Sequence, residues 1–225
     1  RYINTKSKSL AVIYVNNDFG KGGRDTITKL LDGSPTKIVA DISTDAGQVD
    51  FSAAVLKAKQ TNADAVFIYV NEEESARLLR ELRKQGWNKP MIGETTLTGQ
   101  KVIELAGEAA NGAVAHVGLT VEAPQLRAFG ARYKAEYKAE SDHNGVKGYT
   151  GMYILKAAIE KAGKLDRKAV AQALKNSCFS TKQTPNILMD VCFDDKGDLD
   201  RESFLVEVKA GKGEVVATLP PVNKK

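Results

Sequence analysis

Four apolar segments in the first half of the chain each run directly into a short polar cluster. The stretches between the segments carry apolar residues at helical spacing, a pattern typical of a parallel sheet wound with helices. Because the carboxyl ends of parallel strands lie along one edge of the sheet, we expect the clusters to gather there, where such folds bind ligands. The segments, each with its cluster, are 10–15 with Asn16, Asn17 and Asp18, 37–42 with Ser43, Thr44 and Asp45, 65–70 with Asn71, Glu72 and Glu73, and 91–93 with Glu94, Thr95 and Thr96.

The alternation continues to a fifth strand at 112–118 and predicts an α/β fold, a right-handed parallel sheet with flanking helices. The later part of the chain is different: three helices come first and three strands, expected to be antiparallel, come last. The apolar stripes of these helices have no predicted sheet of their own, so they must pack on something else. The expected helices are 124–140, with Pro124 in its first turn, 146–162 and 166–175, and the expected strands are 188–193, 203–208 and 214–219.

Composition and motifs exclude several classes of protein. The 225 residues are 42% hydrophobic, enough to bury a substantial core, and the net charge of +5 comes from scattered Lys and Arg without the basic, aromatic-rich runs of nucleic-acid-binding proteins. No apolar run approaches the roughly 18–20 residues of a membrane span. Spacings typical of metal sites, phosphate-binding loops and catalytic nucleophiles are missing, so we expect no metal, no cofactor and no enzymatic activity.

The chain has two cysteines, Cys178 and Cys192, on either side of a segment that contains Thr and Pro. In an oxidising compartment they would be able to form a disulfide. The alternative is two ordinary buried thiols, and the sequence leaves both open.

A series of short motifs along nearly the whole chain resembles the branched-chain amino-acid-type solute-binding proteins of ABC transporters. Each motif is weak by itself, but they occur in the family's order. They are the run 10–15 with Asp18-Phe19-Gly20-Lys21-Gly22, Asp50-Phe51-Ser52-Ala53, Asn62-Ala63-Asp64-Ala65-Val66, Leu78-Leu79-Arg80, Gly86-Trp87, Pro90-Met91-Ile92-Gly93, Phe129-Gly130-Ala131-Arg132-Tyr133-Lys134, Gly148-Tyr149, Ala157-Ala158-Ile159-Glu160-Lys161-Ala162-Gly163 and Phe193-Asp194-Asp195-Lys196-Gly197-Asp198.

The resemblance implies a type I periplasmic-binding-protein fold, in which two hinged α/β lobes close on a small solute. It assigns residues 1–119 and 188–225 to a complete second lobe and residues 120–187 to a helical segment of the first lobe. The amino-terminal part of the first lobe has no counterpart in the chain, which begins at Arg1, so we expect a fragment of a longer precursor. The missing segment would be the partner that covers the apolar helices.

The resemblance also implies site residues. Phe19 matches an aromatic position that packs on the ligand, and Asn71 matches a position at the end of the third strand. Glu94, Thr95 and Thr96 match a loop that supplies a carboxylate to the ligand's ammonium group, although the acid here stands one place early. The alternative for Phe19 is a hydrophobic staple, and the alternative for Glu94 is a solvated loop acid or a helix cap.

Tyr149 lies close to the family's hinge and cleft, and plain core packing is its alternative. The implied protein is a periplasmic component of an ABC importer that binds a small carboxylate-bearing solute, such as a hydrophobic amino acid or an aromatic or aliphatic acid. ABC permease subunits would be its partners, and nucleic acid would not. A ligand-sensing domain of a receptor or regulator with the same fold is the alternative function.

Overall fold

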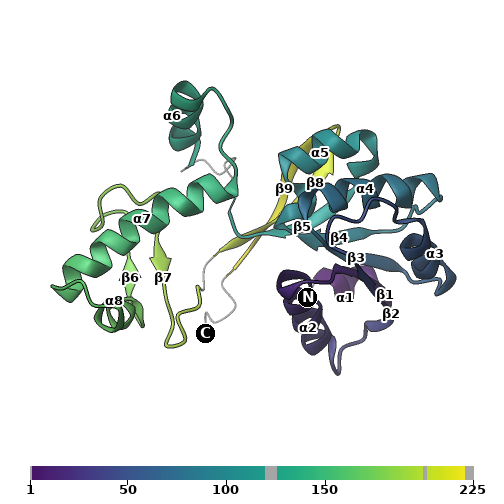
Figure 1. The fold of residues 1–225 in the computed structure, drawn as a ribbon, viewed down its shortest axis with the longest axis horizontal. Helices are drawn as coiled ribbons and strands as arrows, with labels where there is room; N and C mark the ends of the chain where they lie inside the picture. Colours follow the sequence, from purple (N-terminus) through teal and green to yellow (C-terminus); the bar gives the residue numbers. More distant parts are fainter. Residues whose placement is uncertain (1, 120–125, 200–201, 221–225) are drawn as a thin grey trace. The chain divides into compact units, whose positions relative to one another are not determined.

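A computed structural model of the chain describes residues 2–119, 126–199 and 202–220 (Figure 1). Contacts divide the chain into two compact units, and we describe each by itself. Unit 1 consists of Arg1–Val117 with Leu205–Ala217, and unit 2 consists of Gly118–Phe204 with Thr218–Lys225.

A seven-stranded sheet in the order β2-β1-β3-β4-β5-β8-β9 forms the centre of unit 1. The first five strands in the sequence pair in parallel throughout, as the alternation of strand and helix predicts. The fold class is therefore confirmed as α/β with a mostly parallel sheet. The strands are β1 (Ser9–Val15), β2 (Lys37–Thr44), β3 (Ala65–Tyr69), β4 (Met91–Glu94), β5 (Ala113–Val117), β8 (Ser203–Lys209) and β9 (Lys212–Leu219).

Helices cover both faces of this sheet, because right-handed crossovers that move in opposite directions along the sheet place their helices on opposite faces. Figure 1 shows α1 and α2 on one face and α4 and α5 on the other. The helices of unit 1 are α1 (Tyr2–Lys6), α2 (Asp18–Leu31), α3 (Ser52–Gln60), α4 (Glu72–Lys84) and α5 (Gln100–Ala106), with short 3₁₀ turns η1 (Thr95–Thr98) and η2 (Gly107–Ala110).

The core of unit 1 lies on both sides of β1. Leu10, Val12 and Ile13 are completely buried, as expected of a parallel strand that helices cover on both faces. At the far edge, β8 and β9 are joined by Ala210 and Gly211, both with positive φ. A two-residue turn of this kind connects antiparallel strands, so these two of the strands that were expected to be antiparallel form a hairpin.

The described residues of unit 2 form three helices and one small sheet. The helices are α6 (Arg127–Tyr137), α7 (His143–Ala162) and α8 (Arg167–Leu174), and the predicted start of the first of them, at Pro124, lies outside the described residues. The sheet pairs β6 (Cys178–Phe179) with β7 (Val191–Cys192) in antiparallel orientation. In the structure Cys178 and Cys192 form a disulfide between these two strands, which is the first of the two alternatives.

The contact division differs from the predicted lobes in two segments besides the boundary residues 118–119. Residues 188–204 and 218–225 belong to unit 2, whereas the resemblance assigns them to the same lobe as residues 1–119. Only Val191–Cys192 of the predicted strand 188–193 is a strand. Which lobe of a whole protein each unit builds stays a prediction. Among the described residues, no helix has both the length and the apolar character to cross a membrane.

Candidate functional site

Five of the six predicted site residues lie at the carboxyl edge of the sheet in unit 1. Phe19 is in the first turn of α2, which follows β1, and Asn71 is the residue before α4, two positions after the end of β3. Glu94 ends β4, and Thr95 and Thr96 begin η1. The sixth, Tyr149, belongs to α7 in unit 2 and is not part of this edge.

The start of α2 fixes the position of Phe19. The Asn17 side chain accepts a hydrogen bond from Gly20 N at 2.9 Å and so satisfies a free amide of the first helical turn. The backbone of α2 lies against the end of β1, because a Cβ on Gly20 would lie 1.9 Å from Val15 O. Phe19 remains 40% exposed at the edge.

Tyr69, the last residue of β3, supports the Phe19 ring. Their ring centroids are 4.5 Å apart, with the planes tilted by 36°. Burial raises the pKa of Tyr69, and the negative charge of Glu94 raises it further, so the phenol is neutral at physiological pH. Sequence reasoning missed this residue, because an aromatic side chain at the last position of a strand looks like the end of the core.

Glu94 is held by the turn that follows it. Its Oε1 accepts a hydrogen bond from Thr96 N at 2.9 Å, and the Thr95 hydroxyl donates to the carbonyl of His116 at 3.3 Å. The alternative of a helix cap is therefore present in the structure. The same hydrogen bond holds the Glu94 carboxylate at the edge, where Glu94 is opposite His116 in the register of β4 and β5. Burial lowers the pKa of His116.

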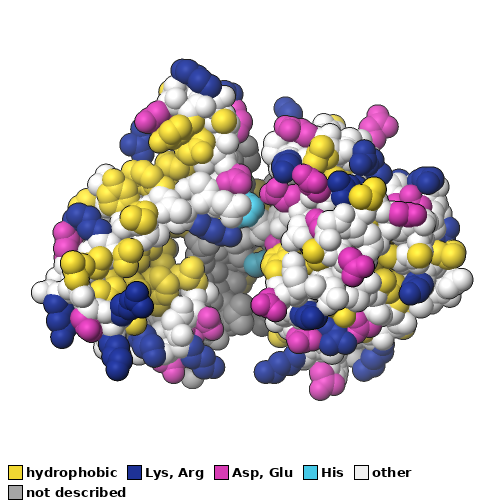
Figure 2. All heavy atoms as spheres, viewed as in Figure 1, with side chains coloured by type: hydrophobic (Ala, Val, Ile, Leu, Met, Phe, Trp, Pro, Cys, Tyr) yellow, Lys and Arg dark blue, Asp and Glu magenta, His cyan; other side chains and the backbone are white. Residues whose placement is uncertain are grey.

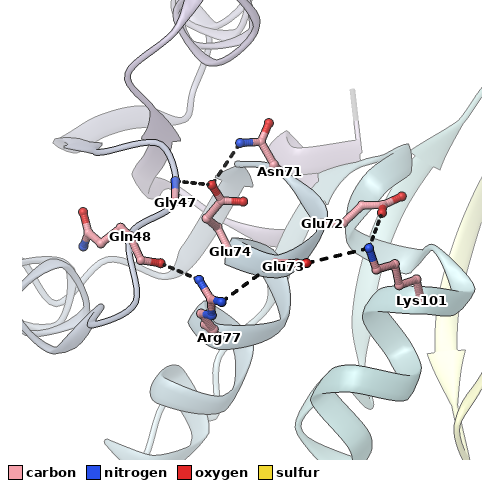
Figure 3. A network of polar contacts seen from close by, with 8 residues as sticks. All are labelled: Gly47, Gln48, Asn71, Glu72, Glu73, Glu74, Arg77 and Lys101. Carbon is pink, nitrogen blue, oxygen red and sulfur yellow. Dashed lines mark hydrogen bonds and ion pairs between the residues drawn. The ribbon is translucent and has the colours of Figure 1, made fainter.

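Asn71 takes part in a polar network at the start of α4 (Figure 3). Its Nδ2 donates to Glu74 Oε1 at 3.0 Å, and Gly47 N donates to the same oxygen at 2.8 Å. Burial alone would raise the pKa of Glu74, but these hydrogen bonds and the charge of Arg77 hold it below its ordinary value. The amide nitrogen of Asn71 thus serves the fold, while its amide oxygen points away from Glu74 in Figure 3.

A hollow of about 390 Å³ lies beside this network, and charged residues line it. Lys101 Nζ lies 3.6 Å from Glu72 and 3.9 Å from Glu73, and Arg77 pairs with Glu73 at 3.4 Å. Exposed pairs of this kind contribute about 0–1 kcal/mol each to stability. These charges pair with one another, and Arg77 also donates to the carbonyl of Gln48 at 3.1 Å, so the hollow has the features of a solvated surface.

Tyr149 lies in an aromatic row between α6 and α7. Its ring centroid is 5.0 Å from those of Phe129 and Tyr153. The row lines a groove of about 660 Å³, and Figure 2 shows hydrophobic side chains gathered over these helices. Tyr137, at the end of the same row, is 61% exposed. Tyr149 therefore packs within unit 2 and also borders an open apolar surface.

The described residues offer little for covalent or metal chemistry. They include no group of three or more His, Cys, Asp or Glu side chains arranged to hold a metal ion. What the edge of unit 1 presents is an exposed aromatic ring, a neutral phenol and a fixed carboxylate. This combination can bind a small solute through apolar contact and charge-assisted hydrogen bonds.

Comparison with known proteins gives the same fold and names a family. A family model described as "Periplasmic binding protein" matches residues 1–213. The leucine-, isoleucine-, valine-, threonine- and alanine-binding protein of Pseudomonas aeruginosa is 28% identical over 202 residues, which are 89% of this chain and 53% of that protein. A Leu/Ile/Val-binding protein of Rhizobium johnstonii is 30% identical over 213 residues, 93% of this chain and 56% of that protein.

Solved structures match the fold over almost the whole chain. The leucine-binding protein of Thermotoga maritima superposes with a TM-score of 0.85 at 24% identity, over 98% of this chain and 63% of that one. A solute-binding protein of an ABC transporter from R. palustris, in complex with benzoate, gives a TM-score of 0.83 at 19% identity, over 98% and 61%. The chain thus spans about half the length of the curated relatives it matches.

Proposed function

The chain belongs to the periplasmic binding protein family, and on this premise we propose that it is part of an extracytoplasmic solute-binding protein of an ABC importer. The observation that carries the proposal is the carboxyl edge of the sheet in unit 1, where Phe19 follows β1 and Glu94 ends β4, two parallel strands with β3 between them. In parallel α/β sheets this edge is where ligands bind. Solute binding without chemistry requires no more than such groups.

The solute that fits these groups is a small carboxylate-bearing compound with an apolar part, either a hydrophobic amino acid or an aromatic or aliphatic acid. Phe19 would contact the apolar part, and Glu94 would pair with an ammonium group if the solute has one. Support comes from two kinds of relative, since curated ones are named for branched-chain amino acids and a solved structure holds benzoate.

The mechanism we propose is hinged closure of two lobes on the solute. A solute shifts the equilibrium toward the closed state only by the difference between its affinities for the two states. Contacts made by Phe19 and Glu94 together with the opposite lobe would supply that difference. The permease subunits would then recognise the closed state.

We assign residues 1–119 and 188–225 to the second lobe and residues 120–187 to the first lobe of the whole protein. The open apolar groove beside Tyr149 supports this assignment, since a surface of this kind is usually covered. The segment that covers it would be the amino-terminal part of the first lobe. A periplasmic location is consistent with the disulfide between Cys178 and Cys192, because disulfides persist in oxidising compartments.

Thermal unfolding with added solutes tests the proposal. The protein, in the full length that its gene encodes, is heated with leucine, isoleucine, phenylalanine, benzoate or glucose. A solute at a hundred times its Kd stabilises the native state by about 2.7 kcal/mol, which would raise Tm by roughly 5–10 °C for 150–250 residues and by less in a longer chain. We expect at least one carboxylate-bearing solute to do so and glucose to have no effect. A flat response to all of them at millimolar concentration would contradict the proposal.

A further inference from the structure

Tyr69 belongs to a row of side chains that crosses the sheet at its carboxyl edge. In the strand register Tyr14 is opposite Tyr69, and Glu94 is opposite His116. Phe67 is opposite Ile92, and Tyr69 and Glu94 each follow two residues later in their own strands. Side chains two residues apart project from the same face of a strand, so Tyr69 and Glu94 also share a face of the sheet. The row therefore places a tyrosine ring next to Glu94.

Contacts on three sides hold the Tyr69 ring in place. Phe19 stacks on it at 4.5 Å, and the Phe67 ring lies 6.0 Å from it, centroid to centroid. On the side of α2 the ring occupies the space that Gly23 leaves, because a Cβ there would lie 2.4 Å from two ring atoms of Tyr69. The helix therefore needs a residue without a side chain at this position.

Tyr69 differs from the rest of its strand in being half-buried. Phe67 is 8% exposed and Ile68 is 1% exposed, as expected of core residues. Tyr69 instead reaches the edge, where its neutral hydroxyl is near the charge of Glu94. The Tyr69 ring therefore borders the edge of the sheet as well as the core.

We propose that Tyr69 is a positioning residue for solute selectivity: its ring holds Phe19 and limits the size of the apolar group that fits between Phe19 and Glu94. The inference rests on the proposed function. It adds a residue that the family resemblance does not assign. Selectivity would arise from two coupled positions, because the ring can stand where it does only with Gly23 opposite.

The ratio of Kd for leucine to Kd for phenylalanine, measured by calorimetry on the full-length protein, tests this inference. We expect Tyr69→Leu to raise this ratio at least tenfold, in favour of phenylalanine, because Phe19 loses its support and the space between Phe19 and Glu94 widens. Tyr69→Phe keeps the ring and should stay within twofold of the wild type. Tyr14→Leu, on the same sheet face one strand away, is the matched control and should also stay within twofold. A loss of stability alone would weaken both ligands equally and leave the ratio unchanged.

A second variant covers the case in which Tyr69→Leu does not fold. Gly23→Ala displaces the ring without removing it and should move the ratio at least threefold, whereas Gly22→Ala, whose Cβ would meet nothing within 4 Å, should not. If the wild type binds a solute and neither Tyr69→Leu nor Gly23→Ala changes the ratio, the inference is wrong and the proposed function stands. If the wild type binds no carboxylate-bearing solute, the proposed function is wrong and the inference falls with it.

Discussion

Three glycines in the first half of α2 differ in what an added methyl group would meet. At Gly22 a Cβ would meet nothing within 4 Å, at Gly23 it would lie 2.4 Å from the Tyr69 ring, and at Gly20 it would lie 1.9 Å from Val15 O. Alanine is favoured over glycine inside a helix by about 0.8–1 kcal/mol. Replacing each of these glycines with alanine therefore gives the same gain in helix propensity but a different steric cost.

The steric costs decide the sign of each effect. Gly22→Ala should stabilise unit 1 by about 0.5–1 kcal/mol, since only the propensity changes. Overpacking costs about 1–3 kcal/mol, so Gly23→Ala should be destabilising by about 1 kcal/mol after the gain in propensity is subtracted. Gly20→Ala should cost about 3 kcal/mol or more, because its Cβ meets backbone that cannot rotate away. Adding Tyr69→Leu should remove the cost of Gly23→Ala.

Urea unfolding followed by tryptophan fluorescence measures these changes. The chain has a single tryptophan, Trp87, and it is 4% exposed within unit 1, so its emission reports on that unit. The midpoint should change while the slope m stays constant, as expected when only native-state stability changes. Equal effects of Gly22→Ala and Gly23→Ala would refute the reasoning, since they would mean that the Tyr69 ring does not occupy the space beside Gly23.

Three further predictions concern other groups. Glu94→Gln should weaken the binding of an amino acid at least tenfold in calorimetry and leave benzoate within twofold; an unchanged amino-acid affinity would remove Glu94 from the site. Replacing Cys178 and Cys192 with serine should lower the free energy of unfolding of unit 2 by about 2–3 kcal/mol, measured by helical circular dichroism in urea, because the disulfide closes a loop of 14 residues. Glu74→Gln should cost about 1–3 kcal/mol at pH 7, because a buried carboxylate that accepts two hydrogen bonds is lost. Since the pKa of Glu74 is lowered in the folded state, its contribution is fully present above its ordinary pKa of about 4.5 and is lost progressively as the pH falls below it toward the lowered pKa, so the difference between the urea midpoints of variant and wild type should shrink as the pH falls from 5 to 3. A constant difference between pH 7 and pH 3 would contradict this explanation.

The sheet edge was predictable because polar residues follow the apolar strands directly. The structure shows that part of this pattern arises from helix capping: Asn17 accepts a hydrogen bond from Gly20 N, and Glu94 accepts one from Thr96 N. A cap and a ligand-binding group need the same short polar side chains at the same place, where a helix begins. The sequence could therefore locate the edge but could not separate the two roles, and for Glu94 the geometry is compatible with both.

The closing part of unit 2 was harder to predict because a strand needs a partner as well as an apolar sequence. Of the predicted strand 188–193 only β7 is a strand, its partner β6 has two residues, and Phe193 forms an isolated bridge with Leu199. Ile187 and Met189 instead pack in the cluster around Ile154 of α7. Short apolar runs fit a strand or a packed loop equally well, and tertiary contacts decide between them.

Tyr69 shows which part of the edge a search for polar clusters misses. Side chains alternate between the faces of a strand, so the last residue of a strand can project into the same space as the polar residues that follow the next strand. An apolar or aromatic residue at that position looks like the end of the core. Its role depends on what stands opposite, and here that is Gly23, 46 positions earlier in the sequence. Neither residue is informative alone. Only the packing of α2 against β3 brings the Tyr69 ring into the space that Gly23 leaves. His116 is a similar case, because it lies near the end of β5 and only the pairing of β5 with β4 places it opposite Glu94.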